Sequence, residues 1–217
     1  MHSPKSPSSG NLVAYEAIKK LIIDGDLPEG QPIRQVEIAD QLGLSKIPVR
    51  EALIRLEAEG LVKLTPNVGA TVIVRTMDDY MEMLYIRLAL ECKALELSIP
   101  NMVEQDIEKS QEILNQYAST EDARERSDLN LAFHESLYAP CMRPQLLKMI
   151  GQVQNQMGRI LRHKISQVAG YKRSMQEHQD ILDACAKADI KLASKLLAKH
   201  LEETQKELRA YFRYQDK

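Results

Sequence analysis

The stretch from Gln35 to Gly60 constrains the fold of this chain more than any other. It contains two short runs with the apolar spacing of helices, separated at Gly43. The second run starts at Ser45, a residue that can cap a helix with its hydroxyl, and it tolerates Pro48 because first-turn amides lack helical partners. Two short helices joined by a glycine turn predict a helix-turn-helix unit, whose second helix can lie in the major groove of DNA. Taken alone, the stretch is equally consistent with a helical hairpin that has a solvated charged face.

A β-hairpin is predicted directly after this unit. Two short runs rich in β-branched residues lie within residues 61–74, and the turn between them contains Asn67 and Gly69. An amphipathic pattern over residues 12–23 supplies a third helix for the core. Together these elements predict a winged helix-turn-helix domain over residues 11–75 that binds double-stranded DNA.

The domain predicted to bind DNA carries no net charge as a whole. Residues 1–75 hold nine Lys or Arg and nine Asp or Glu, so this domain has no overall basic character. Specific binding would therefore rest on a local cluster that dimerisation doubles, and we expect a shallow dependence of affinity on salt. The residues predicted to contact DNA are Arg34, Ser45, Lys46, Pro48, Arg50, Asn67 and Gly69.

This N-terminal part resembles the bacterial GntR family of transcription regulators. The matching words are Leu27-Pro28-Glu29-Gly30, Leu42-Gly43-Leu44-Ser45, Pro48-Val49-Arg50-Glu51-Ala52-Leu53 and Leu56-Glu57-Ala58-Glu59-Gly60. Two positions depart from the family: Lys46-Ile47 stands where members commonly carry Arg-Thr, and the wing lacks the usual basic residue beside Gly69. Because lysine cannot make the bidentate contact of arginine with guanine, we expect a different base preference. The resemblance implies a transcriptional regulator, more often a repressor than an activator.

From Met77 onward the chain reads as helices punctuated by Pro, Gly and Asp. Six helices are predicted, over residues 77–98, 103–117, 120–139, 144–167, 171–186 and 190–214. The expected fold class is therefore mainly α, with an all-α six-helix bundle over residues 76–217 and a disordered arm over residues 1–10. This half resembles an FCD ligand-binding domain in its shorter, VanR-like form, through Tyr85-Ile86-Arg87 with Glu91, Phe133-His134, Glu177-His178, and Ala188-Asp189 with His200-Leu201.

Three of the five histidines, His134, His178 and His200, take inward positions on three of these helices. Each alone could be a core histidine bonded to a neighbour, whereas three together suit Zn²⁺, Ni²⁺ or a similar ion. The resemblance implies a ligand set of one aspartate and three histidines, and it places Asn130 at the aspartate position. An amide is a weaker, uncharged ligand, so metal affinity should fall and a filled site should favour an anionic effector. A polar pocket whose histidines hold the effector directly is the alternative.

Arg87 and Glu91 form an i, i+4 pair that either stabilises its helix or, as the resemblance suggests, helps to hold a carboxylate effector.

The chain is expected to be a cytoplasmic homodimer that binds a pseudo-palindromic operator. No run of residues is expected to span a membrane, and Cys92, Cys141 and Cys185 are expected to be reduced thiols. An enzyme is not expected. Three histidines with an open coordination position can activate water, but no recognisable motif supplies a general base. A regulator that binds DNA without any ligand is a further alternative.

Overall fold

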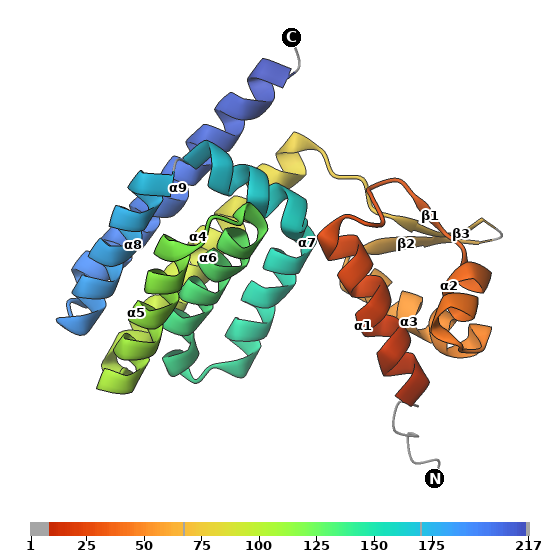
Figure 1. Ribbon diagram of the computed structural model, residues 1–217, viewed down its shortest axis with the longest axis horizontal. Helices are drawn as coiled ribbons and strands as arrows, with labels where there is room; N and C mark the ends of the chain where they lie inside the picture. The colour runs from red at the N-terminus through yellow and green to blue at the C-terminus, as the bar shows by residue number, and fades with distance from the viewer. Residues whose placement is uncertain (1–8, 67, 170, 216–217) are drawn as a thin grey trace. The chain divides into compact units, whose positions relative to one another are not determined.

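The computed structural model describes residues 9–66, 68–169 and 171–215 (Figure 1). The chain divides into two compact units, one containing the described residues up to Thr76 together with residues 155–160, and the other containing the rest. Each unit has its own hydrophobic core. Within the described residues, none of the helices has the length and apolar character needed to cross a membrane.

The N-terminal unit contains three helices and a small antiparallel sheet. Its elements are α1 (Ser9–Asp24), β1 (Pro32–Ile33), α2 (Gln35–Leu42), α3 (Lys46–Ala58), β2 (Val62–Thr65) and β3 (Gly69–Val72). The strand order is β1-β3-β2, and Val62 lies opposite Val72 in the hairpin. The stripe of α3 faces the core, where Val49, Leu53 and Leu56 are fully buried. The winged helix-turn-helix fold is thereby confirmed, with helices and sheet sharing one core.

Three local features of this unit differ from the expectations. Helix α1 begins at Ser9, inside the segment expected to be a disordered arm, and residues 1–8 of that segment lie outside the described residues. Strand β1 adds a third strand to the predicted hairpin by pairing with β3. Ser45 has the extended backbone of an N-cap residue, but its hydroxyl makes no capping hydrogen bond.

The turn between α2 and α3 depends on Gly43. This residue has a left-handed backbone, with φ of 64°, and its N–H donates to the carbonyls that end α2. Glycine adopts this conformation without the steric cost that a Cβ imposes. The turn therefore ends α2 sharply and lets α3 begin three residues later.

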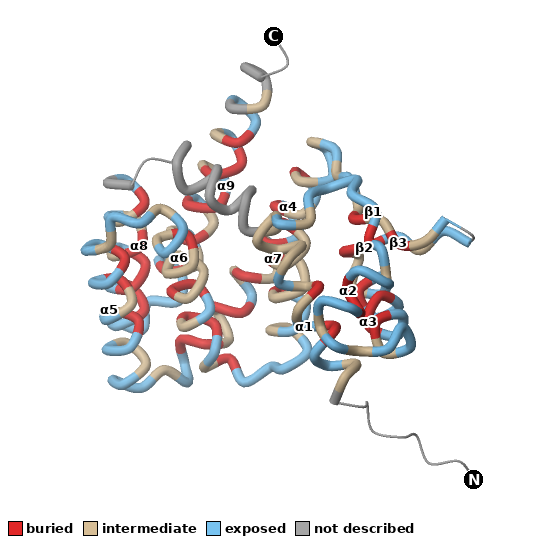
Figure 2. The backbone as a smooth tube through the Cα atoms, turned by 45° about the vertical axis from the view of Figure 1, so that its right-hand side comes forward, coloured by how far each residue is buried: buried red, intermediate tan, exposed pale blue. Residues whose placement is uncertain are grey.

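The C-terminal unit is a bundle of helices, as predicted (Figure 1). The helices are α4 (Met77–Ser98), α5 (Glu104–Ser119), α6 (Ala123–Tyr138), α7 (Pro144–Ala169), α8 (Tyr171–Ala186) and α9 (Ile190–Gln215). Helix α4 packs against α6 and α9, while α5 packs against α6 and α8. Figure 2 shows that buried residues follow one side of these helices and exposed residues the other. This pattern is typical of amphipathic helices around a shared core.

Helix α7 is not the unbroken helix that its sequence predicts. Gly158 has a φ of 68° and a ψ of 162°, so the backbone leaves the helical conformation at that residue.

Elsewhere in the bundle, Cys141 and Cys185 are buried and Cys92 is half-buried, and all three are free thiols. Burial raises the pKa of Cys185 to about 12. The cysteines are therefore core thiols, as expected.

Candidate functional site

The structure brings His134, His178 and His200 together inside the bundle. They come from α6, α8 and α9, and all three are buried. One ring nitrogen from each lies within 4.8 Å of those of the other two. The ring centroids of His134 and His178 are 5.0 Å apart, and those of His178 and His200 are 4.8 Å apart. Amphipathic periodicity alone turns each residue inward, and the packing of three helices makes them meet.

The orientation of His134 is set by a chain of hydrogen bonds. The hydroxyl of Tyr138 donates to Oε2 of Glu91 at 2.8 Å, and Nδ1 of His134 lies 3.2 Å from the same hydroxyl. Because that hydroxyl gives its only proton to Glu91, it must accept from Nδ1–H of His134. This assignment leaves Nε2 of His134 with a free lone pair, and Nε2 is buried without a hydrogen-bond partner.

His200 is oriented in a similar way by a carboxylate. Its Nδ1 lies 2.8 Å from Oε2 of Glu177 on α8. Burial raises the pKa of Glu177, but the hydrogen bond and charge of His200, with Arg173, outweigh burial and lower that pKa. Glu177 is therefore an ionised acceptor at neutral pH, which assigns a proton to Nδ1 of His200.

His178 differs from the other two because both of its ring nitrogens are buried without a hydrogen-bond partner. Its ring instead contacts the rings of Phe133 and Tyr117, at centroid distances of 4.8 Å and 5.6 Å. Burial, followed by the charge of His200, lowers the pKa of His178 well below its usual value. Burial also lowers the pKa of His134, with contributions from His178, His200 and Arg87. His134 and His178 are therefore neutral imidazoles, the form in which histidine binds metals.

Asn130, the fourth predicted ligand, lies on α6 one helical turn before His134 and is half-buried. This spacing puts its side chain on the same side of α6 as His134. The arrangement is consistent with the position that the family resemblance assigned to it. It supplies an uncharged oxygen where a carboxylate would carry a negative charge.

Arg87 and Glu91 form the predicted i, i+4 pair, which is buried and belongs to a larger network. Its Nε donates to Oε1 of Glu91 at 2.6 Å, and both residues are buried. Glu91 also accepts from Tyr138 and from Nε2 of Gln154, the latter at 3.0 Å. Sequence reasoning missed Tyr138 and Gln154. Tyr138 could have been found from its i, i+4 spacing to His134, but no local signal marks Gln154.

Four of the predicted DNA-contacting residues lie at the start of α3. Lys46 and Arg50 are exposed on its first two turns, beside the exposed Ser45 and the half-buried Pro48. Arg34 precedes α2 and pairs with Glu37 at 2.9 Å. In the wing, Gly69 has a φ of 116°, and Asn67 lies outside the described residues.

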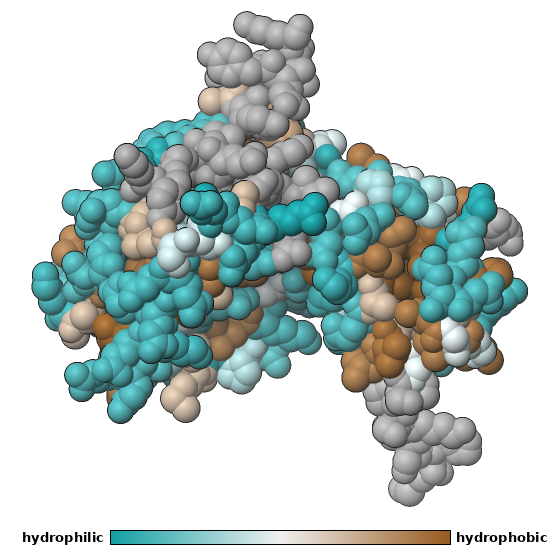
Figure 3. Space-filling model, in the orientation of Figure 1, coloured by the Kyte–Doolittle hydropathy of each residue, from teal (hydrophilic) through white to brown (hydrophobic). Residues whose placement is uncertain are grey.

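An apolar residue that was not predicted to contact DNA lies in the same place. Ile47 is 71% exposed and follows Lys46 directly in the first turn of α3. The space-filling view shows hydrophobic side chains at the surface of this unit (Figure 3).

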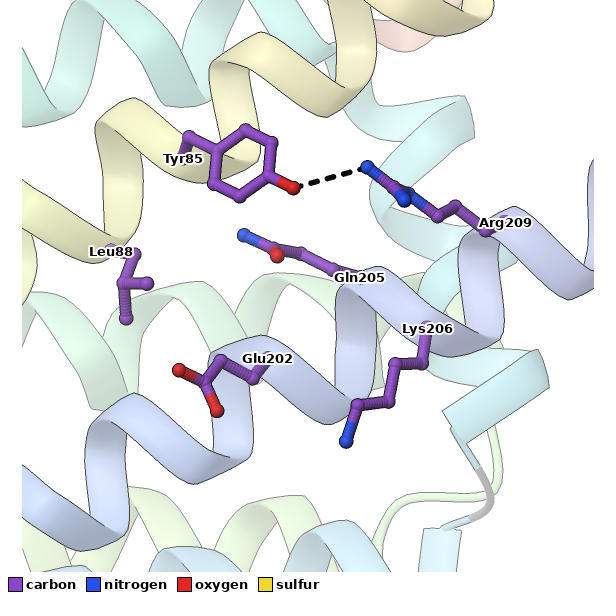
Figure 4. A pocket seen from close by; sticks show the side chains of 6 residues that line it. All are labelled: Tyr85, Leu88, Glu202, Gln205, Lys206 and Arg209. Atoms are coloured by element: carbon purple, nitrogen blue, oxygen red, sulfur yellow. Dashed lines mark hydrogen bonds between the residues drawn. The ribbon is translucent and has the colours of Figure 1, made fainter.

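A surface hollow of about 300 Å³ lies between α4 and α9 (Figure 4). It is lined by Tyr85, Leu88, Glu202, Gln205, Lys206 and Arg209. The guanidinium of Arg209 donates to the hydroxyl of Tyr85 at 3.1 Å and so ties the two helices together. None of the residues predicted as metal ligands lines this hollow.

Comparisons with known proteins cover both units. Residues 12–72 match the family described as bacterial regulatory proteins, gntR family, and residues 82–203 match the FCD domain. The chain is 32% identical over 182 residues to the probable D-xylose utilization operon transcriptional repressor of Paenarthrobacter nicotinovorans, covering 83% of this chain and 80% of that protein.

Two solved structures are also similar. E. coli McbR/YncC has a TM-score of 0.79 and 26% sequence identity, over 94% of this chain and 99% of that one. A GntR family member from Pseudomonas syringae pv. tomato has a TM-score of 0.60 and 31% identity, over 95% of this chain and 87% of that one.

Proposed function

The chain belongs to the GntR family of bacterial transcriptional regulators, with an FCD domain as its C-terminal part, and we propose that it is a homodimeric repressor controlled by a small carboxylate bound at a metal ion. The family consists of transcriptional regulators and not of enzymes, so the metal-dependent enzyme considered from the sequence is set aside. The residues matched to the GntR family lie in the first compact unit, and most of those matched to the FCD domain lie in the second.

The metal proposal rests on one observation, the set of imidazole nitrogens at the centre of the bundle. Nε2 of His134 and both nitrogens of His178 are buried without partners. A buried polar atom that lacks a hydrogen bond costs about 1–3 kcal/mol, and an ion bound to one nitrogen of each ring would remove that cost for Nε2 of His134 and for one nitrogen of His178. His134, His178 and His200 would hold the ion, and imidazole ligands favour Zn²⁺ or Ni²⁺.

The residues around the histidines support the same proposal. Glu177 binds the far nitrogen of His200, and Tyr138 binds the far nitrogen of His134, so that Nε2 of each ring is kept available. Ligand histidines in metal sites characteristically have such a partner on their other nitrogen. His134 and His178 are neutral, so they can bind an ion without first losing a proton.

The effector proposal follows from charge. Three imidazoles, which are uncharged when they bind a metal, and the amide of Asn130 would leave the two positive charges of the ion uncompensated. Arg87 adds positive charge close enough to lower the pKa of His134, although Glu91 pairs with it. When bound, a divalent ion supplies an open coordination position that accepts a carboxylate oxygen. We therefore propose a small organic acid as the effector, with Arg87 favouring it through its charge.

The proposal for DNA binding is a homodimer on a pseudo-palindromic operator in the cytoplasm. A single recognition helix contacts few base pairs, and a two-fold dimer doubles the contacts over two half-sites. Lys46 and Arg50 are exposed where the recognition helix reaches bases and phosphates. The relative from Paenarthrobacter nicotinovorans is named a repressor, which supports the same direction of regulation for this chain.

Metal content tests the first part of the proposal. Wild-type protein is incubated with Zn²⁺ or Ni²⁺, dialysed and analysed by inductively coupled plasma mass spectrometry, beside His134→Ala and His178→Ala. Gln179→Ala, a change at the neighbouring position on α8, is the matched control. We expect near-stoichiometric metal in wild type and control, and its loss in both histidine variants. Wild-type protein that retains no metal would refute the metal site.

Operator affinity tests the effector part. Metal-loaded protein is titrated with DNA selected from a random pool, in the presence and absence of small mono-, di- and tricarboxylates. We expect at least one carboxylate to change DNA affinity and to raise the thermal unfolding temperature. If no carboxylate changes either quantity, the regulator without a ligand becomes the better interpretation.

A further inference from the structure

Ile47 is an apolar side chain exposed on the recognition helix without a place in the core. The inward stripe of α3 consists of other residues, and Val49, Ala52 and Leu53 on that stripe are fully buried. Ile47 is 71% exposed and lies between Lys46 and the turn that carries Arg50. Neither helix capping nor core packing accounts for a large apolar residue at this position.

The position of Ile47 determines which groups of the DNA it can contact. The first residues of a recognition helix contact base edges in the major groove. The donors and acceptors of that groove are polar, and its apolar group is the C5 methyl of thymine. We propose that Ile47 is a specificity-determining residue that packs on a thymine methyl in each half-site. This inference rests on the proposed operator binding by a dimer and is independent of the metal site.

The charged neighbours of Ile47 can hold its side chain close to the thymine methyl. Lys46 and Arg50 are exposed on the same part of α3, and their charges can hold the helix against the phosphates. Ile47 would then exclude water from the methyl group and prefer thymine over cytosine, which lacks that methyl. Burying one methyl-sized group changes an equilibrium about four-fold. If both half-sites make this contact, the binding constant changes about 16-fold.

The test removes the methyl group from the DNA and the side chain from the protein. Duplexes are first selected from a random pool with wild-type protein. Each thymine of a selected half-site is then replaced in turn by deoxyuridine, which keeps base pairing and lacks only the methyl. Affinities are measured by fluorescence anisotropy at one fixed salt concentration, because salt changes the phosphate contribution.

Three protein variants complete the cycle. Ile47→Ala removes the proposed contact, and Ile47→Val keeps most of it. Ile54→Ala is the matched control, because Ile54 is also exposed, at 50%, but lies two helical turns further from the start of α3. Since both isoleucines are exposed, we expect all three variants to unfold at the wild-type temperature.

Within one half-site, we expect deoxyuridine at a single position to weaken wild-type binding about four-fold. The same replacement should leave the binding of Ile47→Ala unchanged. Ile47→Val and Ile54→Ala should still respond to the methyl. If Ile47→Ala responds to deoxyuridine as strongly as wild type, or if no thymine methyl affects wild-type binding, the role of Ile47 is refuted while operator binding stands. A pool that yields no enriched sequence would refute operator binding as well.

Discussion

Replacing Glu91 by leucine should destabilise the bundle severely. Glu91 is 0% exposed and accepts hydrogen bonds from Arg87, Tyr138 and Gln154. Removing its carboxylate takes a counter-charge from the buried guanidinium of Arg87 and a hydrogen-bond acceptor from Tyr138 and Gln154. Breaking a buried ion pair from one side costs about 3–5 kcal/mol, because the remaining charge stays out of water. We expect Glu91→Leu to lower the free energy of unfolding by about that amount.

Urea unfolding of metal-free protein, followed by circular dichroism, measures the effect. The double variant Arg87→Met/Glu91→Leu removes both charges and should be more stable than Glu91→Leu, because apolar side chains can replace a buried pair with little loss. Glu96→Gln is the control, since Glu96 pairs with Lys93 on the same helix but the side chains of the two are 40% and 60% exposed. We expect about 0–1 kcal/mol for that change. A cost below about 1 kcal/mol for Glu91→Leu, or a double variant less stable than the single one, would refute the reasoning.

Three further predictions concern pH, DNA contacts and the turn. Burial lowers the pKa values of His134 and His178 in the fold, whereas unfolded histidine has a pKa near 6.5, so below that pH the unfolded chain binds more protons. Stability of metal-free protein should therefore fall between pH 7.5 and 5.5, by up to about 1.4 kcal/mol per pH unit for each histidine. Urea midpoints that rise toward acid would contradict this. Arg50→Ala should weaken binding to selected DNA by about 1–3 kcal/mol in anisotropy titrations. Lys20→Ala on α1 should leave the affinity for DNA unchanged. Equal losses of affinity in the two variants would count against a specific contact of Arg50. Gly43→Ala should lower the free energy of unfolding by about 1 kcal/mol, as measured by thermal unfolding. The cost comes from backbone strain alone, because φ at this residue is 64° and an added Cβ would meet no atom within 4 Å. A much larger cost would mean that the turn is packed.

The helix-turn-helix could be predicted because its signals are local. Gly43 and the apolar stripe of α3 lie within one short stretch, and the spacing alone indicates the inward faces. Strand β1 was missed because Pro32 and Ile33 become a strand only by pairing with Thr71 and Ala70, far along the chain. The break in α7 was missed because residues on both sides of Gly158 keep helical periodicity.

The three histidines could be predicted because periodicity turned each one inward on its own helix. The hydrogen bonds around them could not, because they join residues distant in sequence. Glu91 meets Tyr138 and Gln154 only after α4, α6 and α7 have packed together. A pair that looks like a helix-stabilising ion pair from its i, i+4 spacing therefore becomes a buried network that reaches His134.

The three histidines also have a consequence for the folding of the chain. They come from three helices, α6, α8 and α9, and α7 lies between the first two of these in the chain. An ion held by all three would act as a reversible cross-link that closes two loops of chain. Closing a loop reduces the conformational entropy of the unfolded state, as a disulfide does. In a chain whose three cysteines are free thiols, metal supply could thus determine how readily the second half of the protein unfolds.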